Sequence, residues 1–249
     1  MNNRTKVLLC DADGSLFPSE DPAFEASCQV TNAFMAAIGS ERRFEPDELR
    51  REAVGKNFRA TAQDLARDAG VDVDQGTVEW WVEEERRQVG AHLGNVLQPD
   101  ASVIEPLTRL AQRFRLAVVS SSATVRLEAC FRATGLDTLF PPAIRFSAED
   151  SLPSPTSKPD PAVYVFAGER LGVRGDQAIA IEDSLAGVQS AVAAGFPTLG
   201  NVQFVAEDER PERIEMLRSA GALAVATSWQ ELEQLCLGGG EPSALAGSR

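Results

Sequence analysis

The chain of 249 residues contains a single histidine, His92. So little imidazole argues against a His-rich metal centre and against a Ser-His-Asp catalytic site. The four cysteines are scattered and have no C-x-x-C spacing, so neither a zinc site nor a disulfide framework is expected. Free thiols suit a reducing compartment, which predicts a cytoplasmic protein.

Long apolar runs are also missing. Residues 1–6 are polar and lead directly into a short apolar run, so no signal peptide is expected. No run approaches the length of a membrane span. The net charge of −13 argues against nucleic acid or an anionic membrane as a partner, because both select basic surfaces. Composition does not decide the oligomeric state.

Three continuous apolar runs have the composition of strands that are buried on both faces. Helix-like segments follow the second and third runs, and such alternation predicts a parallel sheet. The carboxyl ends of parallel strands are where sites form, and the runs end at Asp11, Ser120 and Glu182-Asp183. The runs are residues 7–10, 116–119 and 178–181, and shorter segments at 198–199 and 223–226 are expected as edge strands.

Between residues 17 and 97 the apolar residues follow a helical rhythm instead. We interpret this stretch as an inserted domain, here called the cap. The predicted fold is therefore α/β, a Rossmann-like parallel-sheet core with an inserted all-helical cap. The expected boundaries are 1–16 and 98–237 for the core, 17–97 for the cap, and 238–249 for a small, polar, disordered tail.

The sharpest motif, Asp11-Ala12-Asp13-Gly14, follows the first apolar run. Two carboxylates at the mouth of a buried strand repel each other and resist ionising together. A divalent cation relieves that cost, and Mg²⁺ prefers oxygen ligands while also touching a substrate phosphate. Gly14 allows a sharp turn that brings backbone amides near an anion. A capped strand end with a solvated turn is the structural alternative.

Three further segments are weaker when taken singly. Ser120 and Ser121 offer hydroxyls and amides for phosphate oxygens, although serines are ordinary helix N-caps. Lys158, in Lys-Pro-Asp-Pro, is suited to neutralise a phosphate, although a surface lysine before a helix is equally ordinary. The adjacent carboxylates of Glu182 and Asp183 suit a metal site better than a cap alone.

Taken in order, these four segments resemble the motifs of the haloacid dehalogenase superfamily. The resemblance covers residues 7–200, and the ordered combination is specific although each part is not. The helical insert after the first motif looks like the family's first cap type. That type is typical of the subgroup that contains phosphoglycolate phosphatases and β-phosphoglucomutases.

The resemblance implies a role for each matching residue. Asp11 would be the nucleophile and a metal ligand, and Asp13 the general acid and base that also offers its carbonyl to the metal. Ser120 and Ser121 would bind the phosphoryl group, and Lys158 would stabilise negative charge. Asp183 would be a ligand of Mg²⁺, and Glu182 would bind the ion either directly or through the ion's other ligands. The implied function is a Mg²⁺-dependent phosphatase that hydrolyses a small phosphorylated metabolite through an aspartyl-phosphate.

Other functions remain possible at this point. A phosphomutase uses the same motifs, but its relatives carry a histidine early in the first cap helix, and residues 21–26 contain none. A dehalogenase typically lacks the second aspartate, whereas Asp13 is present. A non-catalytic binding protein would be expected to lose Asp11, Asp13 or Lys158. Ser15, where threonine is usual, and Pro18, where many relatives carry aspartate, depart from the pattern without removing a catalytic group.

The cap offers one candidate loop for recognising the substrate. Residues 55–59 gather two cations and an amide in an otherwise acidic protein, and we expect Lys56, Asn57 and Arg59 to contact the non-reacting part of the substrate. A solvated basic turn is the alternative. The sequence leaves the identity of the phosphorylated substrate open.

Overall fold

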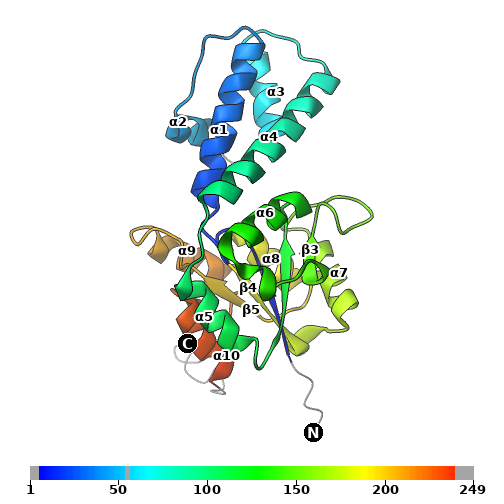
Figure 1. Cartoon of the computed structure of the whole chain (residues 1–249), viewed down its shortest axis with the longest axis vertical. Coiled ribbons are helices and arrows are strands. Elements are labelled where there is room, and N and C mark those ends of the chain that lie inside the picture. The colour runs from blue at the N-terminus through cyan, green and yellow to red at the C-terminus, as the bar shows by residue number, and fades with distance from the viewer. Residues whose placement is uncertain (1–5, 54–56, 239–249) are drawn as a thin grey trace. The chain divides into compact units, whose positions relative to one another are not determined.

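The computed structural model describes residues 6–53 and 57–238, in which six parallel strands form one sheet in the order β3-β2-β1-β4-β5-β6 (Figure 1). The predicted α/β class with a parallel sheet is confirmed. The strands are β1 (Val7–Cys10), β2 (Arg115–Ser120), β3 (Arg145–Ser147), β4 (Ala178–Glu182), β5 (Thr198–Asn201) and β6 (Ala224–Ala226).

Helices alternate with these strands along most of the chain. Those between residues 20 and 96 are α1 (Glu20–Ala37), α2 (Pro46–Glu52), α3 (Phe58–Asp68) and α4 (Gln75–Val96). The others are α5 (Ala101–Leu110), α6 (Thr124–Thr134), α7 (Ala162–Leu171), α8 (Leu185–Ala193), α9 (Arg210–Ser219) and α10 (Trp229–Leu237). Among the described residues, no helix is both long and apolar enough to cross a membrane.

Two details of the sheet differ from the sequence predictions. The segment expected as an edge strand at 198–199 is β5, which lies between β4 and β6, because strand order depends on long-range pairing. The edge beside β2 is instead β3, which has three residues and was not predicted. Its buried Arg145 interrupts the apolar pattern and pairs with Asp137 at 2.7 Å.

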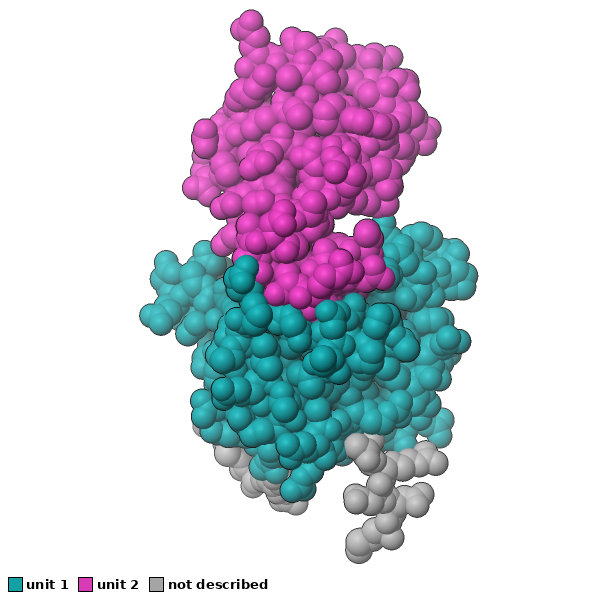
Figure 2. Space-filling view, viewed as in Figure 1, with its two compact units in different colours: residues 1–17, 98–124, 134–249 teal, residues 18–97, 125–133 magenta. Residues whose placement is uncertain are grey.

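The chain divides into two compact units, shown in different colours in Figure 2. The core unit contains the described parts of 1–17, 98–124 and 134–249, and the helical unit contains those of 18–97 and 125–133. The helical unit therefore includes most of α6. The predicted tail lies outside the described residues except for Gly238, and Lys56 lies outside them as well.

In the core unit, one face of the sheet packs against α7 and α8. The strands contribute alternate residues to this cluster, as a pleated strand requires. Tyr164 of α7 is the largest of these buried side chains, and its ring lies 6.3 Å from that of Phe196. The cluster includes Val7, Leu9, Ala117, Val119, Ala178, Ala180, Val163, Ala167 and Ala191.

The helical unit is organised around α1 and α4, which lie side by side and antiparallel in Figure 1. Its core includes Phe34, Met35 and Leu65, and the Phe34 ring meets Trp81 edge to face at 5.8 Å. Helix α2 begins at Pro46, whose fixed φ suits the first helical position. A left-handed glycine, Gly70 (φ +71°), follows α3.

Candidate active site

The register of the sheet brings three chain segments to one edge. Cys10 at the end of β1 pairs with Val118 of β2 and with Ile181 of β4. Asp11 extends the pairing, since its backbone N–H donates to the carbonyl of Ile181 at 2.9 Å. The residues that follow these strand ends are therefore neighbours, although they are far apart in the sequence.

Lys158 lies at the centre of this group. Its Nζ donates to Glu182 Oε1 at 2.6 Å, to the carbonyl of Val119 at 2.8 Å, and to Asp11 Oδ1. These three bonds use all three ammonium protons. The side chains are 5% exposed for Lys158, 10% for Asp11 and 0% for Glu182, so the ion pairs are almost fully shielded from solvent.

The charges at the site perturb one another's ionisation. Burial raises the pKa of Asp11, an effect that Lys158 partly offsets. Burial likewise raises the pKa of Glu182 to about 7. Burial alone would lower the pKa of Lys158, but Asp11 and Glu182 raise it above its ordinary value, so the ammonium stays charged.

A third carboxylate, that of Asp183, completes an acidic cluster. Asp11, Glu182 and Asp183 each have a carboxylate oxygen within 4.8 Å of the others, and all three residues are buried. One ammonium cannot balance three buried carboxylates, so the cluster favours an additional cation. Three oxygen donors without sulfur or imidazole suit a hard divalent ion such as Mg²⁺.

Two glycines leave room for these carboxylates. Gly14 has φ +76°, and a Cβ there would lie 3.0 Å from Cγ of Asp183 and nearer still to one carboxylate oxygen. A Cβ at Gly187 would overlap the carboxylate of Glu182. Glu182 Oε2 is buried and has no hydrogen-bond partner among the described residues. The site therefore holds a carboxylate oxygen that a cation would satisfy, and the residues present fit the predicted metal.

Asp13 lies on the turn that follows β1 and is half-buried. Its Oδ2 accepts from the hydroxyl of Ser122 at 2.6 Å. The turn is fixed from the other side, because the carbonyl of Ser15 accepts from Trp229 Nε1 at 2.8 Å and from Asn201 Nδ2 at 3.2 Å. The carboxylate of Asp13 is not part of the acidic cluster, which leaves it available for another role.

The serine turn after β2 is held by its own hydrogen bonds. Ser120 Oγ accepts from the backbone of Ser122 at 3.0 Å, and Ser121 Oγ accepts from the backbone of Lys158 at 3.1 Å. Ser147 of β3 donates to the carbonyl of Ser122 at 2.8 Å. The core unit thus brings together every core residue predicted for the site.

The structure adds residues that the sequence analysis missed. The hydroxyl of Tyr164 donates to Glu182 Oε1, and Lys158 Nζ lies 5.3 Å from the centroid of the Tyr164 ring. Ser122 contacts Asp13, as described. Tyr164 carried no signal, because an aromatic residue in a helix is typical of a core. Ser122 belongs to the serine triplet that follows the second apolar run, but only Ser120 and Ser121 were predicted as site residues.

The predicted cap loop belongs to the helical unit. Asn57 caps α3, since its side-chain oxygen accepts from the backbone of Ala60 at 3.0 Å. Arg59 forms an ion pair with Glu79 of α4. Both side chains have structural partners within the unit. Their predicted contact with substrate stays a prediction.

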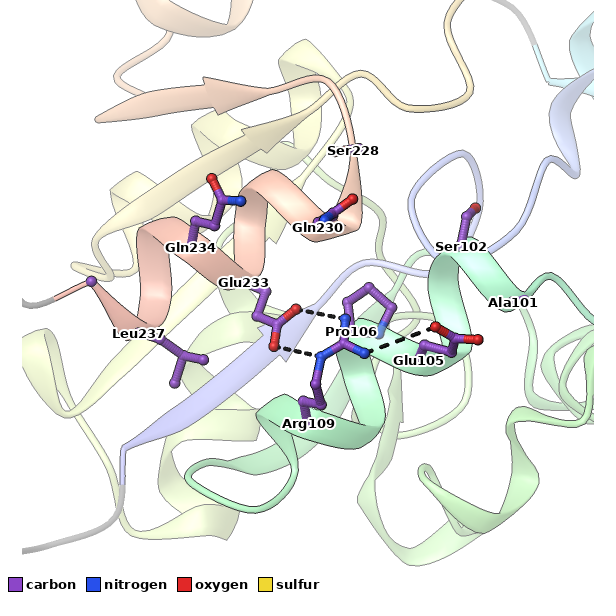
Figure 3. Close-up of a pocket in the computed structure, with 11 residues that line it drawn as sticks. Ala101, Ser102, Glu105, Pro106, Arg109, Ser228, Gln230, Glu233, Gln234 and Leu237 are labelled. Atoms are coloured by element: carbon purple, nitrogen blue, oxygen red, sulfur yellow. Dashed lines mark hydrogen bonds and ion pairs between the residues drawn. The ribbon is translucent and has the colours of Figure 1, made fainter.

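A surface pocket of about 860 Å³ lies between α5 and α10, and none of these site residues lines it (Figure 3). Its charged side chains satisfy one another: Arg109 donates to both carboxylate oxygens of Glu233 at 2.8 Å and lies 3.9 Å from Glu105. The lining has one positive and two negative side chains, so it does not favour an anion such as a phosphate.

Comparison with known proteins agrees with the geometry of the core unit. The chain is 25% identical over 221 residues to the phosphorylated carbohydrates phosphatase of Thermotoga maritima. This match covers 88% of this chain and 93% of that protein. It is 27% identical over 200 residues to SUPPRESSOR OF QUENCHING 1, a chloroplastic protein of Arabidopsis thaliana. That match covers 78% of this chain but only 17% of the larger protein.

A solved structure shares the fold. The HAD family hydrolase of Deinococcus radiodurans R1, crystallised with bound phosphate and sodium, superposes with a TM-score of 0.65 at 22% identity. The superposition covers 99% of this chain and 100% of that one. In the sequence, residues 5–195 match the family of haloacid dehalogenase-like hydrolases. Because this match spans most of the chain, the protein belongs to the haloacid dehalogenase-like hydrolases.

Proposed function

We propose that this hydrolase is a Mg²⁺-dependent phosphatase that cleaves a phosphomonoester of a small metabolite through an aspartyl-phosphate on Asp11. The observation that carries the proposal is the buried carboxylate of Asp11, which is paired with Lys158 beside Glu182 and Asp183 at the carboxyl edge of the sheet. A shielded, oriented carboxylate beside a fixed cation is what a nucleophile toward phosphorus needs.

In the first step, a carboxylate oxygen of Asp11 forms a bond to phosphorus while the bond to the ester oxygen breaks. The leaving oxygen takes a proton from Asp13, whose carboxyl group is oriented by the hydroxyl of Ser122 at 2.6 Å. Lys158 holds Asp11 in place for attack. Ser120 and Ser121 would contact the phosphoryl oxygens from the turn after β2.

In the second step, Asp13 has become a carboxylate and removes a proton from water. The resulting hydroxide attacks phosphorus, the acyl-phosphate bond breaks, and inorganic phosphate leaves. Asp11 recovers its carboxylate, and Asp13 recovers the proton that it gave to the leaving group. Two in-line displacements thus replace one, and each uses a group already oriented in the site.

The carboxylates of Asp11, Glu182 and Asp183, together with the carbonyl of Asp13, are the groups that would hold Mg²⁺. When bound, the ion supplies positive charge to a phosphoryl group that carries spread negative charge. Such a cation would also offset, at the site, the net charge of −13, which would otherwise repel an anionic substrate.

Phosphorylated carbohydrates are the first substrates to test, because the Thermotoga relative is named for that activity. Phosphate bound to the Deinococcus hydrolase also supports a phosphate ligand. We further propose a cytoplasmic location, which the four free cysteines support.

Phosphate release from a panel of phosphorylated sugars and from an aryl phosphate, with Mg²⁺ and with EDTA, tests the function. Quenching with borohydride, which reduces an acyl phosphate to homoserine, tests the intermediate by peptide mass. We expect Mg²⁺-dependent release and a modified Asp11. Release without modification would reject the covalent route, and transfer of phosphate within a sugar would indicate a mutase.

A further inference from the structure

Tyr164 is the only tyrosine in the chain, and it is fully buried on α7. A buried phenol usually finds a hydrogen-bond partner. Phenylalanine fills most core positions without the free-energy cost of burying a hydroxyl group. Here the partner is Oε1 of Glu182, a member of the acidic cluster. The hydroxyl of a residue in the hydrophobic core therefore contacts a carboxylate of the candidate active site.

Glu182 Oε1 has two donors, because Lys158 Nζ also donates to it at 2.6 Å. Two donors from different elements fix the plane of a carboxylate more firmly than one. Oε2 is buried without a partner among the described residues, and it lies against Gly187, where only a glycine leaves room. One carboxylate oxygen of Glu182 thus accepts two hydrogen bonds, and the other is left for a cation.

The ring of Tyr164 is itself held in place. Phe196 packs beside it with centroids 6.3 Å apart, and Lys158 Nζ lies 5.3 Å from its centroid. Val163 and Ala167 of α7 are fully buried in the same cluster. A hydroxyl on so restricted a ring is a fixed donor, whereas a serine or a water at this position would be free to turn.

We propose that Tyr164 is a positioning residue of the metal site, whose hydroxyl orients Glu182 and thereby sets the affinity for the divalent cation. The inference rests on the proposed function only in requiring that a cation binds. The inference goes beyond that function because it assigns control of the affinity for the divalent cation to a side chain that does not contact the cation. A tyrosine that only fills the core would contribute to stability and leave cation affinity unchanged.

Tyr164→Phe removes the hydroxyl and keeps the ring. We expect Mg²⁺ affinity of the purified, phosphate-free protein, measured by calorimetry, to fall by about 10- to 100-fold, as for other partners of metal ligands. In turnover assays, the Mg²⁺ concentration for half-maximal rate rises accordingly, while kcat at saturating Mg²⁺ stays near that of the wild type.

Phe196→Leu is the matched control. It disturbs packing around the same ring and keeps the hydroxyl, so it should lower the melting temperature without changing the Mg²⁺ dissociation constant. An unchanged dissociation constant in Tyr164→Phe would overturn the inference. So would equal losses of Mg²⁺ affinity in the two variants, because packing would then account for the effect.

The wild-type protein provides a second measurement that does not depend on a variant folding. Labelling tyrosine with ¹³C at Cζ gives one resonance, because the chain has one tyrosine. We expect it to shift on titration with Mg²⁺, with the dissociation constant found by calorimetry. A resonance that stays fixed while Mg²⁺ binds would overturn the role of Tyr164 alone. Absence of any Mg²⁺ binding would instead overturn the metal dependence of the proposed function, and this inference with it.

Discussion

Charged residues are used differently in the core unit and in the helical unit. In the helical unit ion pairs lie at helix surfaces, for example Glu83 with Arg86 at 2.8 Å and Asp64 with Arg67 at 2.9 Å, each three positions apart. In the core unit Lys158 pairs with Asp11, 147 positions away, and with Glu182, and none of the three side chains is more than 10% exposed.

The two kinds of pair differ in cost and in use. An exposed pair is screened by water and contributes about 0–1 kcal/mol. A buried group of charges is expensive to desolvate, so it persists only where its partners are fixed and its chemistry is used. Function is therefore expected to be sensitive to the buried charges and indifferent to the exposed ones.

The strongest test of this contrast is Asp11→Asn. An amide is no nucleophile and withdraws a charge from the metal site, so we expect phosphate release to fall by roughly 10⁴-fold or more. Circular dichroism and thermal melting would confirm that the protein is folded. Glu83→Gln, which breaks the exposed ion pair with Arg86, is the control and should retain full activity. Comparable losses in the two variants would remove the contrast.

Withdrawal of the cation should be nearly as severe. Chelation is expected to reduce phosphate release to background, and Mg²⁺ to restore it. Ca²⁺ should inhibit, because it takes more ligands at longer distances and misplaces the nucleophile for in-line attack. Rates measured after exhaustive dialysis against chelator, with metal content checked by elemental analysis, would decide this. Full activity in metal-free protein would contradict it.

A smaller and more selective loss is expected for Asp13→Asn, which removes the proposed general acid. Alkyl phosphates should lose about 10²- to 10⁴-fold in kcat, because their leaving group needs a proton. Aryl phosphates with good leaving groups should lose much less. Ser122→Ala, which removes the hydroxyl that bonds Asp13, should show the same selectivity with a smaller loss. Equal losses on both substrate classes would make Asp13 a structural residue.

The fold was largely predictable from the sequence. Strands buried on both faces are continuous apolar runs, so β1, β2 and β4 were recognised directly. β3 was missed because a segment of three residues that includes Arg145 is too short and too polar to show the hydrophobic pattern of a strand. The position of β5 within the sheet depends on pairing with β4 and β6, which no local pattern encodes.

The site was predictable only where its residues stand at strand ends or in motifs. Asp11, Glu182 and Asp183 were accessible because they end apolar runs. Tyr164 was not, because its contact with Glu182 depends on how α7 packs on the sheet. Gly187 was missed for a similar reason: its role is to leave space for a carboxylate that comes from another element.

The cap loop offers a weaker test, since it asks whether a charge of the cap, that of Lys56, is used for function. If the loop reads the substrate, Lys56→Ala should lower kcat/KM for the native metabolite by about 10- to 100-fold, the value of a lost charged contact. A small aryl phosphate should be unaffected. Arg51→Ala, which removes an exposed cation from the end of α2, is the control. Equal and small effects on both substrates would show that Lys56 does not contact the substrate.

The smallest expected effect concerns Glu85, a half-buried carboxylate of α4, whereas Glu83 of the same helix is exposed. Burial raises its pKa, although a hydrogen bond from Ser27 and the charges of Arg126 and Arg86 oppose the shift. The folded state thus resists ionisation of Glu85 more than the unfolded state does, so stability declines as the pH rises from 4.5, the ordinary pKa of a glutamate.

Glu85→Gln removes this titration. Below pH 4.5 the carboxyl is protonated in both states, so the variant and the wild type should differ by a constant that reflects only the changed contacts. As the pH rises toward neutrality the wild type loses the stability that the variant keeps, so the melting temperature of Glu85→Gln should gain on that of the wild type. Thermal melts across this range measure the difference, with the exposed Glu83→Gln as the control. A melting temperature of Glu85→Gln that falls relative to that of the wild type as the pH rises would mean that Arg126 and Arg86 stabilise the ionised carboxylate more than burial penalises it.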